Sequence, residues 1–111
     1  MIAILKALGE ATRFQIVELL LGGPRPVGDM AVQLGLRQPQ VSKHLRVLSD
    51  AGLVGVRVDA QRRIYALQPE ALKELEVWVE KYRRLWEENL QRLDLLEENK
   101  TKEKRRGRKK G

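Results

Sequence analysis

Apolar side chains recur every three or four residues through much of the chain, which is the spacing of amphipathic α-helices. The pattern predicts short helices at about residues 2–8, 11–21 and 28–34, each followed by glycine. A fourth helix is expected to begin near Gln38 and to end before Gly52. The expected inward side chains of the second helix are Phe14, Ile16, Val17, Leu20 and Leu21.

After the fourth helix, apolar side chains occur at every second residue instead of every third or fourth, which indicates a strand. Val54, Val56 and Val58 are expected to line the buried face of that strand. A polar turn over residues 59–62 and a returning strand over 63–67 complete a predicted hairpin.

The last predicted helix runs from about residue 70 to residue 98 and is long for so small a domain. Its 29 residues would measure about 43 Å at 1.5 Å per residue. Because its apolar stripe is longer than the core of one small domain can cover, we expect this helix to pack in a homodimer on the same helix of the second copy and on the first helix. The expected dimer contacts are Leu5, Leu75, Trp78, Val79, Tyr82, Trp86 and Leu90. An ordinary surface helix, or a ligand pocket lined by the aromatic residues, remains an alternative.

Two short helices joined through Gly35 form the pattern of a helix-turn-helix, and the hairpin then forms a wing. The fold class is therefore mainly α with a small β-hairpin, a winged helix-turn-helix dimerising through its first and last helices. Amide side chains at the start of a helix in the major groove can pair with adenine, and lysine can donate to guanine or phosphate. The expected DNA-binding side chains of this recognition helix are Gln38, Gln40, Ser42, Lys43, His44 and Arg46.

Charge separates the chain into distinct parts. The net charge is +7, but residues 1–99 are neutral, with +4 over residues 11–67 and −4 over residues 68–99. On the hairpin, Arg57, Arg62 and Arg63 are expected to reach phosphates or the adjacent minor groove. A basic face of this kind suits nucleic acid.

The remaining positive charge lies at the C-terminal end. Residues 1–98 are expected to form one DNA-binding and dimerisation domain, and residues 99–111 a disordered basic tail. The tail residues expected to follow the DNA backbone are Lys104, Arg105, Arg106 and Arg108. A merely solubilising tail is the alternative.

The composition argues against several other classes of protein. The chain has no cysteine and one histidine, so we expect no metal site, no cofactor and no catalytic centre. No apolar run is long enough to span a membrane, and the first residues lack the features of a signal peptide, so a cytoplasmic location is expected.

Three segments together carry a family resemblance. Residues 5–13 (LKALGEATR), 38–45 (QPQVSKHL) and 48–54 (LSDAGLV) resemble the ArsR/SmtB family of winged helix repressors. The resemblance implies a homodimer, an operator near its own promoter and repression. Thiolate-type members carry a cysteine pair on the helix that here spans residues 28–34. This chain has none, and residues 78–86 are similar to a metal-independent branch of the family.

Two other functions compete with a sequence-specific regulator of double-stranded DNA. One is a non-specific architectural DNA-binding protein, which the neutral body disfavours. The other is a protein-interaction module that uses the long last helix. The sequence leaves open the operator, the regulated genes, the presence of a small-molecule inducer, and whether the protein represses or activates.

Overall fold

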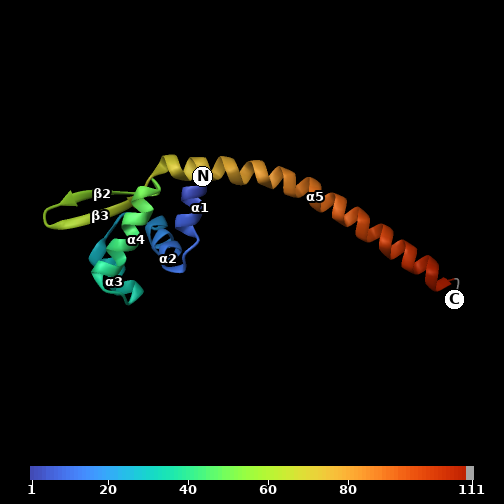
Figure 1. Ribbon diagram of the computed structural model, residues 1–111, viewed down its shortest axis with the longest axis horizontal. Coiled ribbons are helices and arrows are strands. Elements are labelled where there is room, and N and C mark those ends of the chain that lie inside the picture. The colour runs from blue at the N-terminus through green and yellow to red at the C-terminus, as the bar shows by residue number, and fades with distance from the viewer. Residues whose placement is uncertain (110–111) are drawn as a thin grey trace. The chain divides into compact units, whose positions relative to one another are not determined.

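The computed structural model describes the backbone of residues 1–109 and the side chains of residues 1–97. Residues 1–76 form one compact unit, and the chain from Val77 onward forms a second. The elements of the chain, labelled in Figure 1, are α1 (Ile2–Leu8), α2 (Ala11–Leu21), β1 (Arg25–Pro26), α3 (Val27–Leu34), α4 (Gln38–Asp50), β2 (Val54–Asp59), β3 (Arg62–Leu67) and α5 (Pro69–Lys109). The expected mainly α fold with a hairpin is confirmed.

The core of the first unit is built around one face of α4. Val41, Leu45 and Leu48 have no exposed surface, as expected from their helical spacing. They pack among buried side chains of α2 and α3, including Ile16 and Met30. Each such side chain stabilises the fold by roughly 1.5–3 kcal/mol through burial. This packing decides which face of α4 points to solvent.

The turn between α3 and α4 depends on a glycine. Gly35 follows α3 with a φ of 66°, and its N–H and that of Leu36 cap the carbonyls at the end of α3. Glycine adopts this left-handed conformation without the steric cost of a Cβ atom. The predicted helix-turn-helix therefore forms at the expected place.

The sheet has one strand more than expected. β1 pairs with β3, so that three antiparallel strands stand in the order β1-β3-β2. β1 has only two residues, one of them proline, so no alternation of apolar side chains could predict it. β2 and β3 form the predicted hairpin in a register that pairs Arg57 with Ile64 and Asp59 with Arg62.

The prediction that four apolar side chains of α2 and β2 are buried is wrong. Phe14 and Leu21 are 50% and 66% exposed, because the core covers only the side of α2 that carries Ile16 and Leu20. Val56 and Val58 are 51% and 72% exposed. The outer part of β2 pairs with β3 alone, and only Val54 at its base is buried in the core.

The last helix is also longer than expected, since α5 continues to Lys109 instead of ending near residue 98. Lysine, arginine and glutamate dominate this segment and are good helix formers, so charge alone did not indicate where the helix ends. The side chains proposed for backbone contact, Lys104, Arg105, Arg106 and Arg108, lie outside the described side chains.

We predict that Leu45→Ala lowers the free energy of unfolding by about 2–5 kcal/mol, because a fully buried leucine leaves a cavity when truncated. Urea or thermal denaturation measures this change. The control Val32→Ala, at a side chain that is 82% exposed on α3, should change stability by less than about 0.5 kcal/mol. Equal losses for both variants would contradict the described core.

Candidate nucleic-acid interface

The first half of α4 presents polar side chains to solvent while its other face is buried. The exposed members of the predicted recognition set are Gln38, Gln40, Ser42, Lys43 and Arg46, and His44 is half-buried. The buried stripe of Val41, Leu45 and Leu48 holds these side chains on a rigid helix. The structure therefore exposes the polar members of the predicted set around α4, with Lys43 and Arg46 opposite the buried stripe as the sequence spacing indicated.

Gln40 has a structural contact that the sequence reading did not assign. Its side-chain oxygen accepts a hydrogen bond of 3.1 Å from the backbone N–H of Arg37, which precedes α4. Such a contact satisfies a backbone donor next to the helix start. The amide nitrogen of Gln40 still has its donors, so this side chain can cap the helix and donate to a base at once.

Gln38 lies against α3 rather than standing freely above α4. A Cβ atom on Gly28 would approach the amide nitrogen of Gln38 to 3.2 Å. Both residues line a concavity of about 440 Å³ between the two helices and the hairpin. Its other lining residues are Pro26, Val27, Asp29, Ser42, Gln61, Arg62 and Arg63.

This concavity joins the recognition helix to the wing. The backbone at the start of α3, where N–H groups carry partial positive charge, forms part of its wall. Arg62 and Arg63 line it from the hairpin, and Ser42 lines it from α4. These groups favour an anion, although the carboxylate of Asp29 also lies on the wall.

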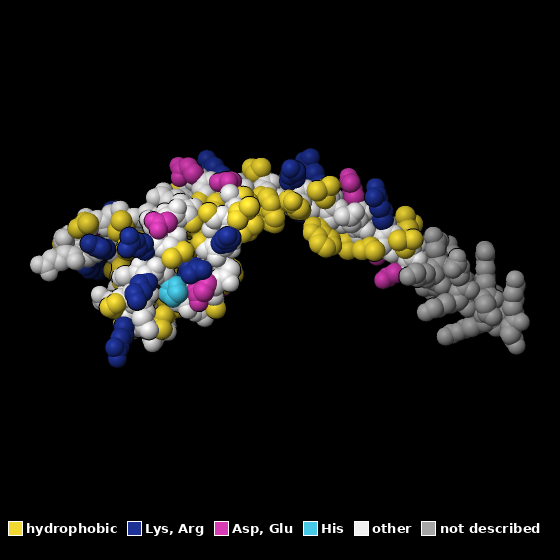
Figure 2. Space-filling model, in the orientation of Figure 1, with side chains coloured by type: hydrophobic (Ala, Val, Ile, Leu, Met, Phe, Trp, Pro, Cys, Tyr) yellow, Lys and Arg dark blue, Asp and Glu magenta, His cyan; other side chains and the backbone are white. Residues whose placement is uncertain are grey.

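The three hairpin arginines are exposed on both faces of the ribbon. The strand register puts Arg57 and Arg62 on the face of Ile64, and Arg63 on the face of Val58. Among residues 1–97, none of the three has an acidic partner within 4.0 Å. In Figure 2, Lys and Arg side chains gather over the hairpin and around α4, which gives this side of the first unit its positive charge.

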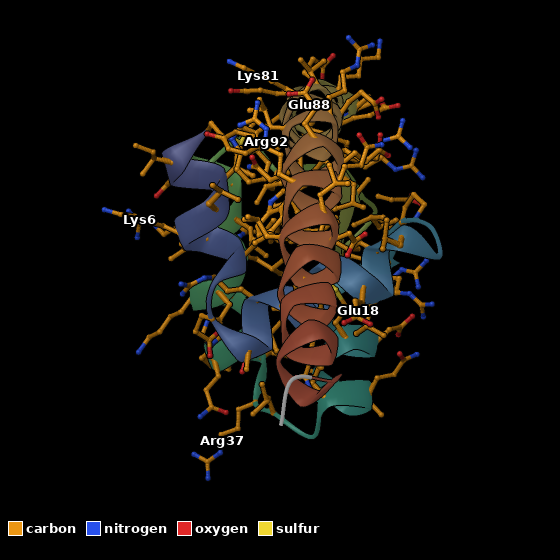
Figure 3. The ribbon with its side chains drawn as sticks, turned by 90° about the vertical axis from the view of Figure 1, so that its right-hand side faces the viewer. Lys6, Glu18, Arg37, Lys81, Glu88 and Arg92 are labelled. Atoms are coloured by element: carbon orange, nitrogen blue, oxygen red, sulfur yellow. The ribbon has the colours of Figure 1, made fainter. Side chains whose placement is uncertain are left out.

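One exposed cation was missed by the sequence reading. Arg37 immediately precedes α4, and Figure 3 shows its side chain pointing into solvent, away from the helices. The position of Arg37 directly before the recognition helix could have identified it from the sequence as a candidate DNA contact. By contrast, Arg25 donates to the carbonyl of Leu19 at 2.9 Å, which ties it to α2.

His44 is half-buried, as expected, and lies near the acidic residue that caps the start of α2. Its Nδ1 atom lies 3.6 Å from Oε2 of Glu10, and its side chain is 27% exposed. Glu10 precedes α2 and accepts a hydrogen bond of 2.9 Å from the N–H of Arg13. That hydrogen bond is the main cause that lowers the pKa of Glu10 below its usual value.

No metal or membrane signature appears in the described part of the chain. Residues 1–97 contain no group of three or more His, Cys, Asp or Glu side chains placed to hold a metal ion. None of the described helices is long and apolar enough to cross a membrane.

The second unit presents an apolar stripe on α5. Val79, Tyr82, Trp86 and Leu90 of the predicted dimer set are between 42% and 59% exposed, and Figure 2 shows hydrophobic side chains along this helix. The rings of Trp78 and Tyr82 have centroids 4.5 Å apart. In the first unit, Leu5 is 38% exposed, whereas Leu75 packs partly against the core.

Comparisons with known proteins agree with this architecture. Residues 10–56 match the family described as bacterial regulatory protein, arsR family. The chain is 42% identical over 77 residues to the HTH-type transcriptional regulator Rv2034 of Mycobacterium tuberculosis, covering 69% of this chain and 72% of the relative. It is 30% identical to the transcriptional repressor SdpR of Bacillus subtilis, covering 68% and 84% of the two chains.

A solved structure shows the same fold. It is the homodimeric winged helix-turn-helix DNA-binding domain of Mb0332 from Mycobacterium bovis, which is 30% identical. The match covers 74% of this chain and 76% of that domain, with a TM-score of 0.62.

We predict that Gln40→Glu separates capping from DNA reading. The carboxylate still accepts from the N–H of Arg37, so thermal stability should be unchanged or slightly higher. Loss of the amide donor and the added negative charge should weaken specific DNA binding at least about tenfold. Gln15→Glu, which adds the same charge on an exposed position of α2, is the matched control. Unchanged DNA affinity would remove Gln40 from the reading set.

We also predict that Glu10 contributes stability that acid removes. Because its pKa is lowered in the folded protein, its contribution is present above the ordinary value of 4.5 and is lost as the pH falls through the folded value. Glu10→Gln should therefore be less stable than the wild type at pH 7, and the difference should shrink as the pH falls below 4.5. Urea denaturation across this range measures it. A difference that does not vary with pH would contradict the assignment.

Proposed function

Because the chain belongs to the ArsR family of bacterial regulatory proteins, we propose that it binds a specific site in double-stranded DNA as a homodimer and represses transcription there. One observation carries the proposal. The exposed polar start of α4 and the cationic hairpin border the same concavity, so one DNA duplex can contact both.

The recognition helix supplies base contacts in this proposal. α4 enters the major groove with its first turns leading, and Gln40 and Lys43 reach the base edges. Arg46, farther along α4, contacts the phosphate backbone. Gln38, which lies against α3, reaches a base only at the edge of the groove.

The hairpin and the concavity supply backbone contacts. A phosphate seated between the start of α3 and the wing would meet backbone N–H groups, Ser42 and the guanidinium groups of Arg62 and Arg63. Arg57 follows the next phosphates or the minor groove. These contacts fix the register of the protein on DNA without selecting a sequence.

The homodimer is proposed to form through α1 and α5. Leu72, Leu75, Val79, Tyr82, Trp86 and Leu90 recur at spacings of three and four on one side of α5. An exposed stripe of this size on a small domain is unfavourable in water unless a partner covers it. Two-fold pairing would present two recognition helices about 10 base pairs apart, so the operator should be an imperfect palindrome.

Repression follows from occupancy of a site near a promoter, where the dimer competes with polymerase in the cytoplasm. The similarity to SdpR of Bacillus subtilis, which is a transcriptional repressor, supports this sense of regulation. The basic residues 99–111 are proposed to follow phosphates beyond the specific site and to raise affinity for all DNA sequences.

The deciding experiment measures binding of the purified protein to its own upstream DNA and to random DNA of equal length at about 0.15 M salt. We expect a preference of about a thousandfold and two protomers per site. A variant ending at residue 99 should bind both DNAs more weakly and with a flatter salt dependence. Equal binding of the full chain to both DNAs would overturn the proposal in favour of an architectural protein.

We predict that Trp86→Lys dissociates the dimer, because a lysine in the apolar stripe of α5 would bury an unpaired charge. Light scattering after size-exclusion chromatography gives the mass. Val77→Lys is the control, since Val77 is 69% exposed and lies on the opposite side of α5 from Trp86 by helical spacing. A dimeric Trp86→Lys variant would exclude this stripe from the interface.

A further inference from the structure

Glu10 makes two contacts, and only one of them is explained by helix capping. Its carboxylate accepts from the N–H of Arg13 at the start of α2 and also lies 3.6 Å from Nδ1 of His44 on α4. Both contacts use the same oxygen, Oε2. One side chain therefore joins the start of α2 to the recognition helix.

The length of the Glu10 side chain is explained better by its contact with His44 than by its capping of α2. Serine, threonine, aspartate and asparagine are the preferred capping residues, because their short side chains reach the nearby N–H groups. Glutamate has one more methylene group than aspartate. Here that extra length lets the capping oxygen also stand beside the imidazole of His44.

His44 stands at the edge of the DNA-facing side of α4. It follows Lys43 directly and lies one helical turn after Gln40, between the buried stripe and the exposed side chains. Figure 2 shows the histidine, in cyan, at the surface beside an acidic side chain and among Lys and Arg side chains. With Nδ1 facing Glu10, Nε2 is the ring nitrogen left for another partner.

The same segment is also tied to α1. Arg13 donates from Nε to the carbonyl of Ala7 at 2.6 Å and from its terminal nitrogen to the carbonyl of Lys6 at 3.3 Å. These carbonyls belong to the end of α1, where helical partners are missing. Arg13, whose backbone N–H binds the Glu10 carboxylate, is thus tied to α1, and this fixes the start of α2 from which Glu10 reaches His44.

We propose that Glu10 is a positioning residue for DNA binding: it accepts the Nδ1–H of His44 and holds the ring with Nε2 facing a DNA phosphate, to which the ring donates after Nε2 takes up a proton from solvent. A carboxylate at one ring nitrogen sets which nitrogen carries the proton and how the ring is oriented. A ring already oriented loses less freedom when it contacts the phosphate, so binding is stronger. The proposal rests on the proposed function, because the phosphate belongs to the operator.

The variant Glu10→Asp separates capping from positioning. Aspartate caps α2 at least as well and keeps the negative charge, but it is one methylene group too short to keep its place beside His44. We expect an unchanged or higher melting temperature together with operator affinity about fivefold to tenfold weaker. In a His44→Ala background, Glu10→Asp should weaken operator binding no further, which a double-mutant cycle measures.

A spectroscopic readout tests the contact without DNA. His44 is the only histidine of the chain, so its two ring ¹⁵N signals need no assignment among several residues. In the wild type, the neutral ring should carry its proton on Nδ1, and in Glu10→Asp the proton should move toward Nε2. Failure to see Nδ1 protonation in the wild type would overturn the proposal even if both variants bind DNA poorly.

The outcomes for DNA distinguish this proposal from the proposed function. If the wild type does not prefer its operator over random DNA, the proposed function fails. If the wild type prefers its operator and Glu10→Asp binds equally well, or weakens binding equally with and without His44, the positioning role of Glu10 is wrong.

Discussion

The structure depends on the burial of one face of α4. Val41, Leu45 and Leu48 have no contact with solvent, and they fix the rotation of the helix about its own axis. Once that rotation is set, Gln40 and Lys43 have to point outward. A reading surface for DNA needs this kind of rigidity, because a base contact tolerates little displacement of the donor. The apolar core therefore acts on function through geometry.

Around this helix, polar side chains satisfy backbone groups at helix ends, and one of them also links the start of α2 to α4. Gln40 caps the start of α4, Arg13 caps the end of α1, and Glu10 caps α2 while it contacts α4. The capping contacts lie at helix ends, where backbone groups lack partners. Several residues of the candidate interface thus have a structural role beside the proposed binding role. A loss of DNA affinity in a variant has to be compared with its stability before it is assigned to recognition.

In the proposed function, the first unit contacts DNA and the second unit forms the dimer. The first unit carries the recognition helix, the hairpin cations and the concavity between them. The second carries the apolar stripe of α5, which includes Tyr82 and Trp86 and is exposed in a single chain. Pairing of two chains through the stripe of α5 would cover this apolar surface and at the same time double the number of DNA contacts. The affinity of the dimer for DNA then depends on protomer concentration, so regulation by concentration needs no ligand.

The sequence by itself determined the order and type of the main elements, because helical spacing, alternation and glycine stops are local signals. It also predicted that the polar side chains at the start of α4 stay exposed. Tertiary structure alone decided which apolar positions stay exposed, such as Phe14 and Val58, since that depends on what packs against each face. It likewise decided the pairing of β1 with β3 and the contact between Glu10 and His44, because residues distant in sequence meet only in the folded chain.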